Sequence, residues 1–348
     1  MKKIQENNQK RRILLVGGAG YIGTALTDYL LTRGYSIKVL DHLLYQNGSC
    51  MLPFLSHPNF EFLWGDFTHQ NTAQAALYDT TDVIILAGLV GDPITKKYPE
   101  LSEKINHQGM LRFINQLSDY PLNQVIFIST CSNYGLIREN VLADENWPLK
   151  PLSLYAKAKV AVETFLLSQK NKVNYCPTIL RFSTAFGVSP RMRFDLTVNE
   201  FTRELYLGKE LVVYDHETWR PYCHVLDFAY ILCKVLEAPK DKINFEVFNV
   251  GCERNNYTKA MIVEVVKKYL PNAKVRYQEN GADPRNYRVN FEKIKTVLEF
   301  KAKYTISDGI LETLNALRKN CFQDIAQRPN FYGNYEIYHA ISEESVVA

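Results

Sequence analysis

Short apolar segments that alternate with longer helical stretches restrict this chain to one class of fold. From residue 13, stretches with helical periodicity separate six runs rich in β-branched residues: ILLVGG, SIKVLD, FEFLWGD, DVIILAG, QVIFIST and CPTILRFS. Strands that alternate with helices are joined by right-handed crossovers and form a parallel sheet that is covered on both faces. The sequence therefore predicts an α/β fold built on a doubly wound parallel sheet.

The pattern is less regular beyond residue 180. There the sequence predicts helices near 196–207, 227–236, 258–269 and 306–319, with the short strands ELVVYD, RPYCHV, FEVFNVG and KVRYQE between them. A chain of 348 residues is long enough for about two domains. We predict a first domain over residues 11–180 and a smaller, mixed α/β lobe over residues 181–330, with RPYCHVLDFAYIL and FEVFNVG returning to the first domain.

Charge and composition disfavour several classes of protein. The 41 basic and 37 acidic residues nearly balance, and no long basic block follows the start, so nucleic acid is not expected as a partner. The start lacks the apolar core of a signal peptide, and no run approaches the roughly 18 apolar residues of a membrane helix. We expect a cytoplasmic protein with a frayed first ten residues and no membrane partner. The seven cysteines form no C-x-x-C pair and the seven histidines fall singly, so no metal site is expected.

A glycine-rich turn follows the first predicted strand. The segment ILLVGGAGYIG places Gly17, Gly20 and Gly23 between that strand and the first helix. Glycine at these positions permits a sharp turn, a close approach of a pyrophosphate to the backbone, and tight packing of the helix. Asp41 ends the second strand, 18 residues after Gly23, where a carboxylate would bind an adenosine ribose and repel a 2′-phosphate. These residues predict a Rossmann-type domain that binds NAD rather than NADP.

A tyrosine and a lysine lie one helical turn apart in LYAKAKV. Tyr155 and Lys159 share a helix face, a pattern that by itself is more typical of a solvated helix. Here they follow a nucleotide-binding turn, and Thr130 ends a buried strand 25 residues before Tyr155. A lysine ammonium and a positive nicotinamide both favour the phenolate of a tyrosine whose pKa is otherwise about 10. We predict that Tyr155 takes a hydroxyl proton while hydride leaves the same carbon for NAD, that Thr130 holds the hydroxyl, and that Lys159 tunes Tyr155.

With these residues the chain resembles, over nearly its whole length, the extended short-chain dehydrogenase/reductases of the NAD-dependent sugar-nucleotide epimerase/dehydratase family. The resemblance rests also on GD at 65–66, AGL at 87–89, Asn106 and RPYCHVLD. It departs from one epimerase branch at Val90, where that branch has a lysine that contacts the cofactor. The resemblance implies cofactor contacts from Gly17, Gly20, Tyr21, Ile22, Gly23, Asp41, His42, Asp66, Phe67, Ala87, Gly88, Leu89, Asn106, Ser129, Tyr155 and Lys159.

The end of the strand VIFIST separates the branches of this family. In the dehydratases an Asp–Glu pair directly follows the catalytic threonine and acts as acid and base in the loss of water. This chain has Cys131 and Ser132 there, and neither a thiol with a pKa of about 8.5 nor a hydroxyl can replace a carboxylic acid. The sequence therefore favours redox chemistry at one carbon over 4,6-dehydration.

The second lobe is expected to hold a nucleotide-diphosphate sugar. The resemblance implies contacts from Thr184, Asn199, Arg220, Asp283 and Arg285, and arginine suits a diphosphate because its planar fork donates two bonds at once. Further candidates, each of which is equally suited to a surface salt bridge, are Arg191, Arg193 and Arg288. The segment GVSPRMRFDLTVN is similar to bacterial GDP-heptose C4 oxidases of surface-glycan pathways. The resemblance also implies a homodimer through the helices around 101–117 and 155–169.

Three functions compete at this point. The favoured one is NAD-dependent oxidation at C4 of a nucleotide-linked sugar, with the keto product either released or returned as the 4-epimer. The second is reduction of a 4-keto sugar or of a small carbonyl compound. The third is a non-catalytic scaffold that binds NAD, which the presence of Thr130, Tyr155 and Lys159 disfavours.

Overall fold

A seven-stranded parallel sheet forms the centre of the computed structural model, which describes residues 11–137, 141–281, 283 and 285–337. The expected fraying of residues 1–10 lies outside the described residues. In spatial order the strands are β11 (Glu246–Val250), β7 (Cys176–Phe182), β5 (Gln124–Thr130), β4 (Asp82–Ile85), β1 (Arg12–Val16), β2 (Ser36–Asp41) and β3 (Phe60–Trp64). Every neighbouring pair in this sheet is parallel. The predicted doubly wound α/β fold is confirmed.

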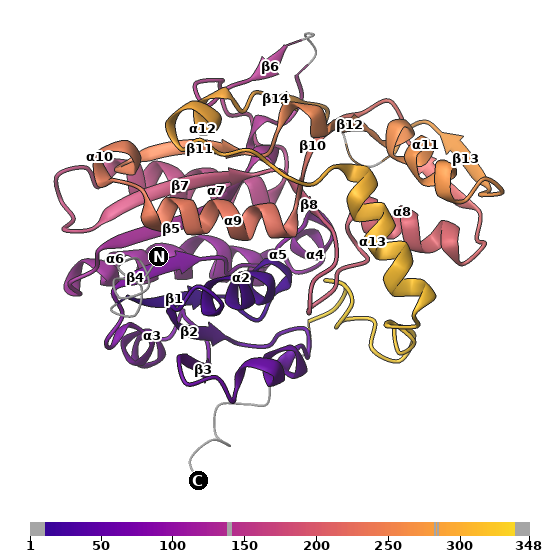
Figure 1. Ribbon diagram of the computed structural model, residues 1–348. Coiled ribbons are helices and arrows are strands. Elements are labelled where there is room, and N and C mark those ends of the chain that lie inside the picture. The colour runs from indigo at the N-terminus through magenta and orange to yellow at the C-terminus, as the bar shows by residue number, and fades with distance from the viewer. Residues whose placement is uncertain (1–10, 138–140, 282, 284, 338–348) are drawn as a thin grey trace.

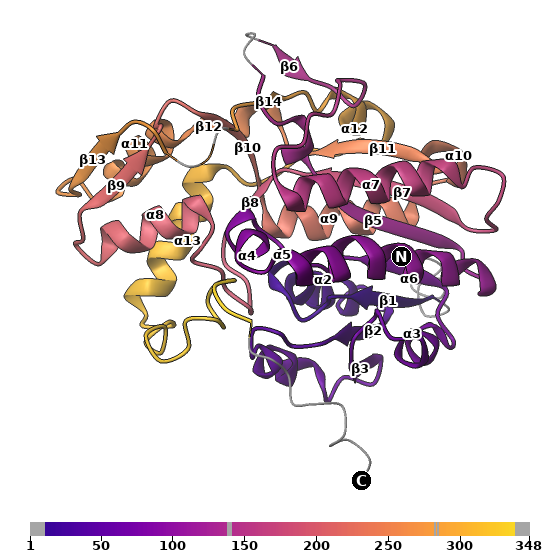
Figure 2. The same cartoon turned by 180° about the vertical axis from the view of Figure 1, so that it is seen from behind.

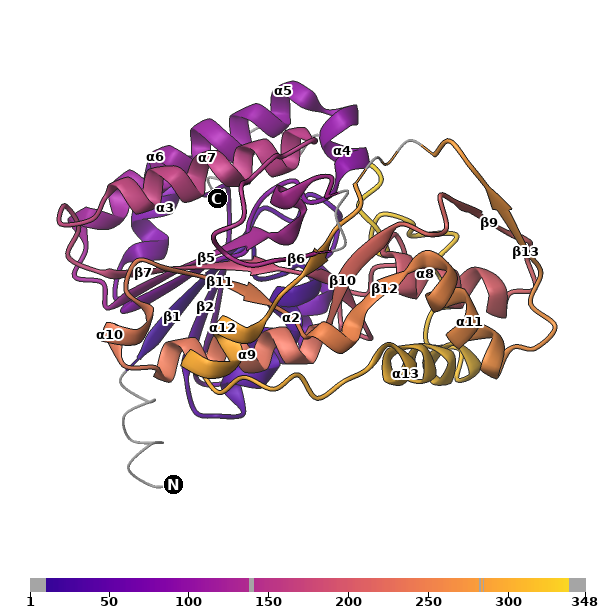
Figure 3. The same ribbon diagram turned by 90° about the horizontal axis from the view of Figure 1, so that it is seen from above.

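Helices cover both faces of the sheet, as Figure 3 shows. One face carries α2 (Tyr21–Leu31) and α9 (Val225–Glu237), and the other carries α3 (Gln70–Leu77), α6 (Met110–Gln116) and α7 (Leu154–Ser168). Two apolar clusters fill the space between the sheet and these two helical layers. Because both faces are buried, the central strands are apolar at nearly every position, and all seven residues of β7 are buried.

The helix predicted around 101–117 is divided. It consists of α5 (Pro99–Ser102), the π-helical η2 (Glu103–Gly109), α6 and the short η3 (Leu117–Asp119). In η2, the Asn106 side chain accepts from the backbone N of Leu89 at 2.7 Å and donates to the Leu89 carbonyl at 3.0 Å. The wider turn of η2 thus contains the residue that fixes the loop after β4, and π-turns commonly occur at functional sites.

A smaller lobe stands beside the sheet and contains its own apolar cluster (Figure 1). Its helices are α8 (Thr197–Tyr206), α11 (Lys259–Tyr269) and α13 (Ile306–Arg318). Its strands form a three-stranded sheet of β12 (Asn256–Thr258), β10 (Trp219–His224) and β8 (Thr184–Phe186), and a pair of β13 (Val275–Gln278) and β9 (Leu211–Tyr214). From β10 the chain re-enters the first lobe through α9, which packs on α2, and through β11, which pairs with β7.

Shorter elements complete the described chain. They are η1 (Gly48–Phe54), α4 (Asp92–Lys97), η4 (Cys131–Tyr134), β6 (Leu142–Ala143), α10 (Lys240–Ile243), η5 (Glu253–Asn255), β14 (Arg288–Val289) and α12 (Glu292–Val297). In the residues described, none of the helices combines the length and the apolar character that crossing a membrane requires.

A buried ion pair fixes α7 against the carboxyl ends of β5 and β7. The Arg181 guanidinium donates to the Glu163 carboxylate at 2.8 and 3.1 Å, and the two side chains are only 5% and 2% exposed. Glu163 also accepts from the Ser129 hydroxyl and, at 2.8 Å, from the Asn133 amide, while Arg181 donates to the Tyr134 hydroxyl at 3.0 Å. Much of the polar run after QVIFI therefore serves to hold the helix that carries Tyr155 and Lys159.

Glu163→Gln should lower the free energy of unfolding by about 3 kcal/mol, because it leaves the Arg181 cation buried without its counter-charge. Urea denaturation measures the loss. The matched control is Glu246→Gln, which removes a half-exposed partner 2.7 Å from Lys293 and should cost less than about 1 kcal/mol. Equal, small losses in both variants would show that the buried pair does not stabilise this end of the sheet.

Candidate active site

A cavity of about 430 Å³ lies at the carboxyl ends of the sheet strands and extends to the smaller lobe. Most residues that the sequence proposed as functional line it: Gly17, Gly20, Tyr21, Ile22, Gly23, Asp41, His42, Asp66, Phe67, Ala87, Gly88, Ser129, Thr130, Tyr155, Lys159, Thr184, Arg191, Arg193, Arg220, Asp283 and Arg285. Leu89, Asn106, Asn199 and Arg288 are not among the lining residues.

The three glycines of the first turn differ in how much space their neighbours leave for a side chain. Gly17 has a φ of 82°, and a Cβ there would lie 2.6 Å from the Ala87 Cα. A Cβ on Gly23 would lie 2.4 Å from the carbonyl oxygen of Gly18. A Cβ on Gly20 would meet nothing closer than the Gly17 carbonyl oxygen at 3.4 Å. Packing therefore explains two of the glycines, whereas the third leaves open backbone of the kind that a phosphate approaches.

The beginning of α2 faces the same space. Its N-cap, Gly20, provides no side-chain cap, and its first turn contains no acidic residue. The N–H groups of a first helical turn have no partners within the helix, and together with the helix dipole they attract an anion. The turn and the helix start thus fit the pyrophosphate of a dinucleotide.

Asp41 connects the end of β2 to the glycine turn. Its carboxylate accepts from the backbone N of Ala19 at 3.0 Å and of Leu43 at 2.8 Å. Burial raises the pKa of Asp41, and these two hydrogen bonds act against that rise. Farther along the cavity, Asp66 accepts from the backbone N of Thr68 at 2.8 Å, and the Phe67 ring packs edge-on against Phe113. Asp41, Asp66 and Phe67 thus line the same cavity as the glycine turn.

The polar residues that follow β5 serve two purposes. The Thr130 hydroxyl lies in the cavity, 2.9 Å from the Ser132 hydroxyl, and accepts from the Ser132 backbone N at 3.1 Å. Cys131 is fully buried, its thiol donates to the Arg181 carbonyl at 3.1 Å, and burial raises its pKa to about 12. Ser129 lines the cavity, but its hydroxyl donates to Glu163. Thr130 and Ser132 therefore line the cavity with hydroxyls that lie within hydrogen-bond distance of each other, whereas the Ser129 hydroxyl is bonded to Glu163.

Tyr155 and Lys159 lie together on α7 and line the cavity beside the end of β5. The Lys159 Nζ is 5.7 Å from the centre of the Tyr155 ring and donates to the Ile128 carbonyl at 2.7 Å. Burial lowers the pKa of Lys159 to about 7, and the nearby Glu163 carboxylate acts in the opposite direction. Burial raises the pKa of Tyr155, whereas the positive charge of Arg193 lowers it. Arg193 lines the same cavity, and its positive charge favours the Tyr155 phenolate.

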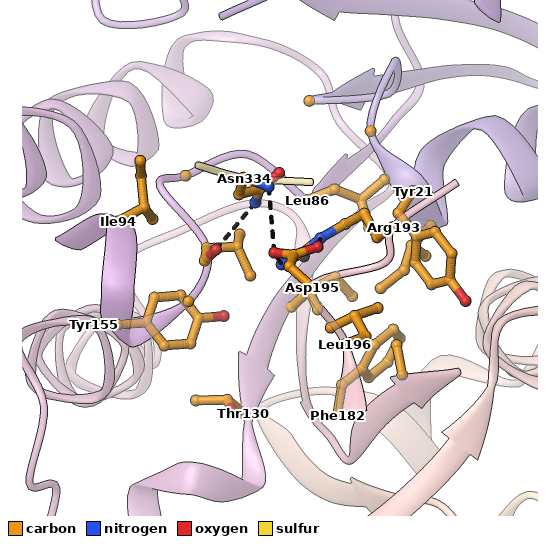
Figure 4. A pocket seen from close by; sticks show the side chains of 18 of the residues that line it. Tyr21, Leu86, Ile94, Thr130, Tyr155, Phe182, Arg193, Asp195, Leu196 and Asn334 are labelled. Atoms are coloured by element: carbon orange, nitrogen blue, oxygen red, sulfur yellow. Dashed lines mark hydrogen bonds and ion pairs between the residues drawn. The ribbon is translucent and has the colours of Figure 1, made fainter. Parts of the chain in front are cut away.

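Arg193 belongs to a group that the sequence revealed only in part (Figure 4). Its guanidinium donates to the Asp195 carboxylate at 2.9 and 2.5 Å. Asn334 donates from its backbone N to Asp195 at 3.2 Å and from its side chain to the Val90 carbonyl at 3.0 Å. Asp195 lies in a segment that the sequence did single out, but no motif pointed to Asn334.

The basic residues expected to hold a diphosphate form a second charged group. Asp283 lies between Arg285, whose Nε and Nη2 each donate to it at 2.8 Å, and Arg220 at 3.0 Å. Burial tends to raise the pKa of Asp283, but the hydrogen bonds and charges of the two arginines hold it well below its usual range. Arg285 also pairs with Asp92 across the cavity at 3.1 Å. The predicted trio is brought together, and Asp92 was missed because no sequence pattern links it to residue 285.

Two residues that were predicted to contact ligands do not line the cavity. Asn199 was expected to face the substrate, but it is fully buried, accepts from the Gly187 backbone N at 3.0 Å and donates to the Arg193 carbonyl at 2.9 Å. Asn106 was expected at the cofactor, but it binds both backbone groups of Leu89. Both amides hold segments that line the cavity and do not line it themselves, because each is satisfied by backbone.

The sequence and the structure are both similar to those of known proteins. Residues 13–251 match the model of the NAD dependent epimerase/dehydratase family. UDP-glucuronic acid decarboxylase 4 of Arabidopsis thaliana is 25% identical over 326 residues, which cover 91% of this chain and 70% of that protein. UDP-glucuronate 4-epimerase of Thermodesulfobacterium geofontis is 23% identical over 322 residues, with coverage of 88% and 96%. The crystal structure of dTDP-glucose 4,6-dehydratase from Bacillus anthracis with NAD is similar at a TM-score of 0.76 and 25% identity, with coverage of 89% and 97%.

Gly20→Ala should weaken NAD binding by about tenfold or more, because a methyl group would stand where the pyrophosphate meets the backbone. The melting temperature should change by less than about 2 °C, since the chain itself leaves room for that methyl group. Isothermal titration calorimetry and thermal unfolding measure the two effects. Gly23→Ala is the contrasting variant and should lower the melting temperature, because its Cβ meets Gly18. Unchanged NAD affinity in folded Gly20→Ala would contradict this placement of the pyrophosphate.

Proposed function

The chain belongs to the NAD-dependent epimerase/dehydratase family and is an enzyme with NAD as its cofactor, and from this premise we propose that it oxidises the C4 hydroxyl of a nucleotide-diphosphate sugar. The observation that carries the proposal is one cavity that holds Tyr155, Thr130 and Lys159 together with the arginines of the smaller lobe. The scaffold hypothesis does not account for this combination. Release of the 4-keto sugar and return of its 4-epimer are the two outcomes that the proposal covers.

The relatives support chemistry at C4. Two of them are named a 4-epimerase and a 4,6-dehydratase, and the third is named a decarboxylase of a sugar acid. A ketone at C4 is β to the carboxyl carbon of a hexuronic acid, and β-keto acids lose carbon dioxide readily. Oxidation at C4 is thus a step that all three reactions can share.

In the proposed reaction, NAD supplies the acceptor for the C4 hydride when it is bound. The Tyr155 phenolate takes the proton of the C4 hydroxyl, and the Thr130 hydroxyl holds that group in line. Ser132 fixes the Thr130 rotamer through its 2.9 Å contact. Lys159, held by the Ile128 carbonyl, supports Tyr155 from the same helix face. Each residue thus has one task, and the hydride and the proton leave the substrate in separate directions.

The residues beside Thr130 favour redox chemistry alone. Removal of a proton from C5 or of hydroxide from C6 needs an acid or base near pH 7. Cys131 is buried with a pKa raised to about 12, and Ser132 is bonded to Thr130. The loop that follows β5 therefore positions the C4 hydroxyl of the substrate and supplies no carboxyl group for dehydration.

The charged residues of the smaller lobe fit the diphosphate. Arg220 and Arg285 line the cavity, and Asp283 holds their guanidinium groups near each other. Planar guanidinium groups suit phosphate oxygens.

A role in the synthesis of surface-glycan sugars remains a prediction. A homodimer through α6 and α7 also remains a prediction, and light scattering of the purified protein would measure its mass.

A panel of GDP-, UDP-, dTDP- and CDP-sugars tests the reaction. We expect either NADH formation with a 4-keto product or a 4-epimer without net NADH, as resolved by absorbance and NMR. The product should keep its C6 substituent and carry no solvent deuterium at C6 when the reaction runs in deuterated water. A 4-keto-6-deoxy sugar, or a pentose with release of carbon dioxide, would overturn the proposal that one carbon alone reacts. Reduction of keto sugars without the reverse oxidation would favour the reductase alternative.

Tyr155→Phe is the control for this panel. It keeps the ring and removes the ionisable oxygen, so turnover should fall by about 10²-fold or more while NAD binding survives. Near-normal turnover in that variant would remove Tyr155 from the mechanism.

Arg193→Met should move the low-pH limb of the kcat/KM profile to higher pH. The rate rises with pH as Tyr155 loses its proton, and removal of Arg193 takes away the positive charge that most lowers the pKa of Tyr155. It also leaves the negative charge of Asp195 without its partner, which acts in the same direction. Lys157→Met, an exposed change on the same helix, should leave the limb in place. An unmoved limb in Arg193→Met would show that Arg193 does not set the ionisation of Tyr155.

A further inference from the structure

The chain that follows α13 returns from the smaller lobe to the sheet lobe, as Figure 2 shows in yellow. We call residues 329–337 the C-terminal strap. On the smaller lobe, the Tyr332 carbonyl accepts from the Phe194 backbone N at 2.8 Å. On the sheet lobe, Glu336 accepts from the Tyr98 hydroxyl at 2.7 Å, and Ile337 joins the apolar cluster beneath α6 and α7. The strap thus contacts both lobes, and its residues Asn334 and Tyr335 line the cavity.

Arg191 holds the strap from inside the cavity. Its side chain is 2% exposed, and its Nη2 donates to the carbonyls of Asn330 at 3.1 Å and Gly333 at 3.2 Å. Its guanidinium carbon lies 5.1 Å from the centre of the Tyr45 ring. These contacts orient the guanidinium but do not neutralise it.

The charge of Arg191 lacks a bonded counter-ion. In the described part of the chain its hydrogen-bond acceptors are carbonyls, and its Nε has no partner. Burial, and then the positive charge of Arg193, lower its pKa to about 10, while the charge of the Asp195 carboxylate acts in the opposite direction. Arg193, two residues later, is by contrast paired with Asp195. A buried cation that is hydrogen-bonded to no carboxylate is costly, so a cavity built this way suits an anionic ligand.

The segment before Arg191 is fastened to the first turn of α2. The Ser189 hydroxyl donates to the Tyr21 carbonyl at 2.6 Å and lies 2.9 Å from the Thr24 hydroxyl. The Arg191 backbone N donates to the same Thr24 hydroxyl at 3.4 Å, and the Tyr21 hydroxyl donates to the Gly187 carbonyl. These contacts fasten the backbone of Arg191 to the first turn of α2. Two positive features, the start of α2 and the Arg191 side chain, therefore line the same cavity.

We propose that Arg191 binds the pyrophosphate of the dinucleotide while its Nη2 holds the C-terminal strap, so that cofactor binding and strap docking stabilise each other. This assigns Arg191 to the cofactor, although its sequence context placed it among the residues for the substrate. The inference rests on NAD as the cofactor and is independent of which sugar is oxidised. The strap thereby becomes part of the nucleotide site, although it lies outside the residues that match the family model.

The test is ligand binding to protein freed of cofactor, measured by calorimetry for Arg191→Met and the unchanged chain. NAD and ADP-ribose should bind about tenfold or more weakly to the variant, because a charge-assisted hydrogen bond to the phosphate is lost. Adenosine, which has no phosphate, should bind within about twofold of its original affinity, as should UDP and GDP. The matched control is Arg203→Met, a nearby arginine that already pairs with Glu204 and should leave all these affinities unchanged. Weaker UDP or GDP binding with unchanged NAD binding would return Arg191 to the substrate, and no change at all would overturn the assignment.

The coupling to the strap has a separate readout that needs no variant. ADP-ribose should slow hydrogen exchange in residues 329–337 of the unchanged chain, whereas adenosine should not. In Arg191→Met the ADP-ribose effect should disappear, and a chain that ends at residue 328 should bind NAD more weakly. Strap exchange that is indifferent to ADP-ribose in the unchanged chain would overturn the coupling, even if Arg191→Met failed to fold.

Discussion

Burial of the parallel sheet on both faces is the constraint from which the rest of the molecule follows. Helices occupy the space above and below the strands, so polar side chains can gather only where the strands end. The glycine turn, Asp41 and Thr130 all lie at that edge, each at the carboxyl end of a different strand. The smaller lobe covers the same edge, and its arginines meet the sheet residues in a shared cavity.

The sequence predicted the sheet well because its signal is local. Each of the seven strands stands out as a short apolar run, and the helix limits followed from periodicity, as for α7 and α13. The short pairings of β6 with β14 and of β8 with β10 were not predicted, because two or three residues contain no pattern of their own. The π-turn of η2 was missed for a related reason, since what distinguishes it is the contact of Asn106 with Leu89.

The contrast between local sequence patterns and contacts between distant residues also separates the site residues that could be predicted from those that could not. Thr130, Tyr155 and the glycines have fixed spacing within one segment, so the sequence could identify them. Asp92 and Asn334 gain their roles through partners such as Arg285 and Asp195, which are distant in the chain. Asn199 is the converse case, because its segment suggested a ligand contact, whereas in the structure its side-chain amide is bonded to backbone groups.

The pairing of β11 with β7 has a consequence for folding during translation. Thr178 of β7 lies opposite Glu246 of β11, and the chain between them builds much of the smaller lobe. While a ribosome synthesises that stretch, β7 forms an open edge of the nascent sheet, and all seven of its residues are ones that the folded protein buries. Unpaired apolar edges invite association between chains. Until residues 246–250 have been translated, the nascent sheet therefore lacks the partner of its β7 edge, which is the condition that favours association between chains.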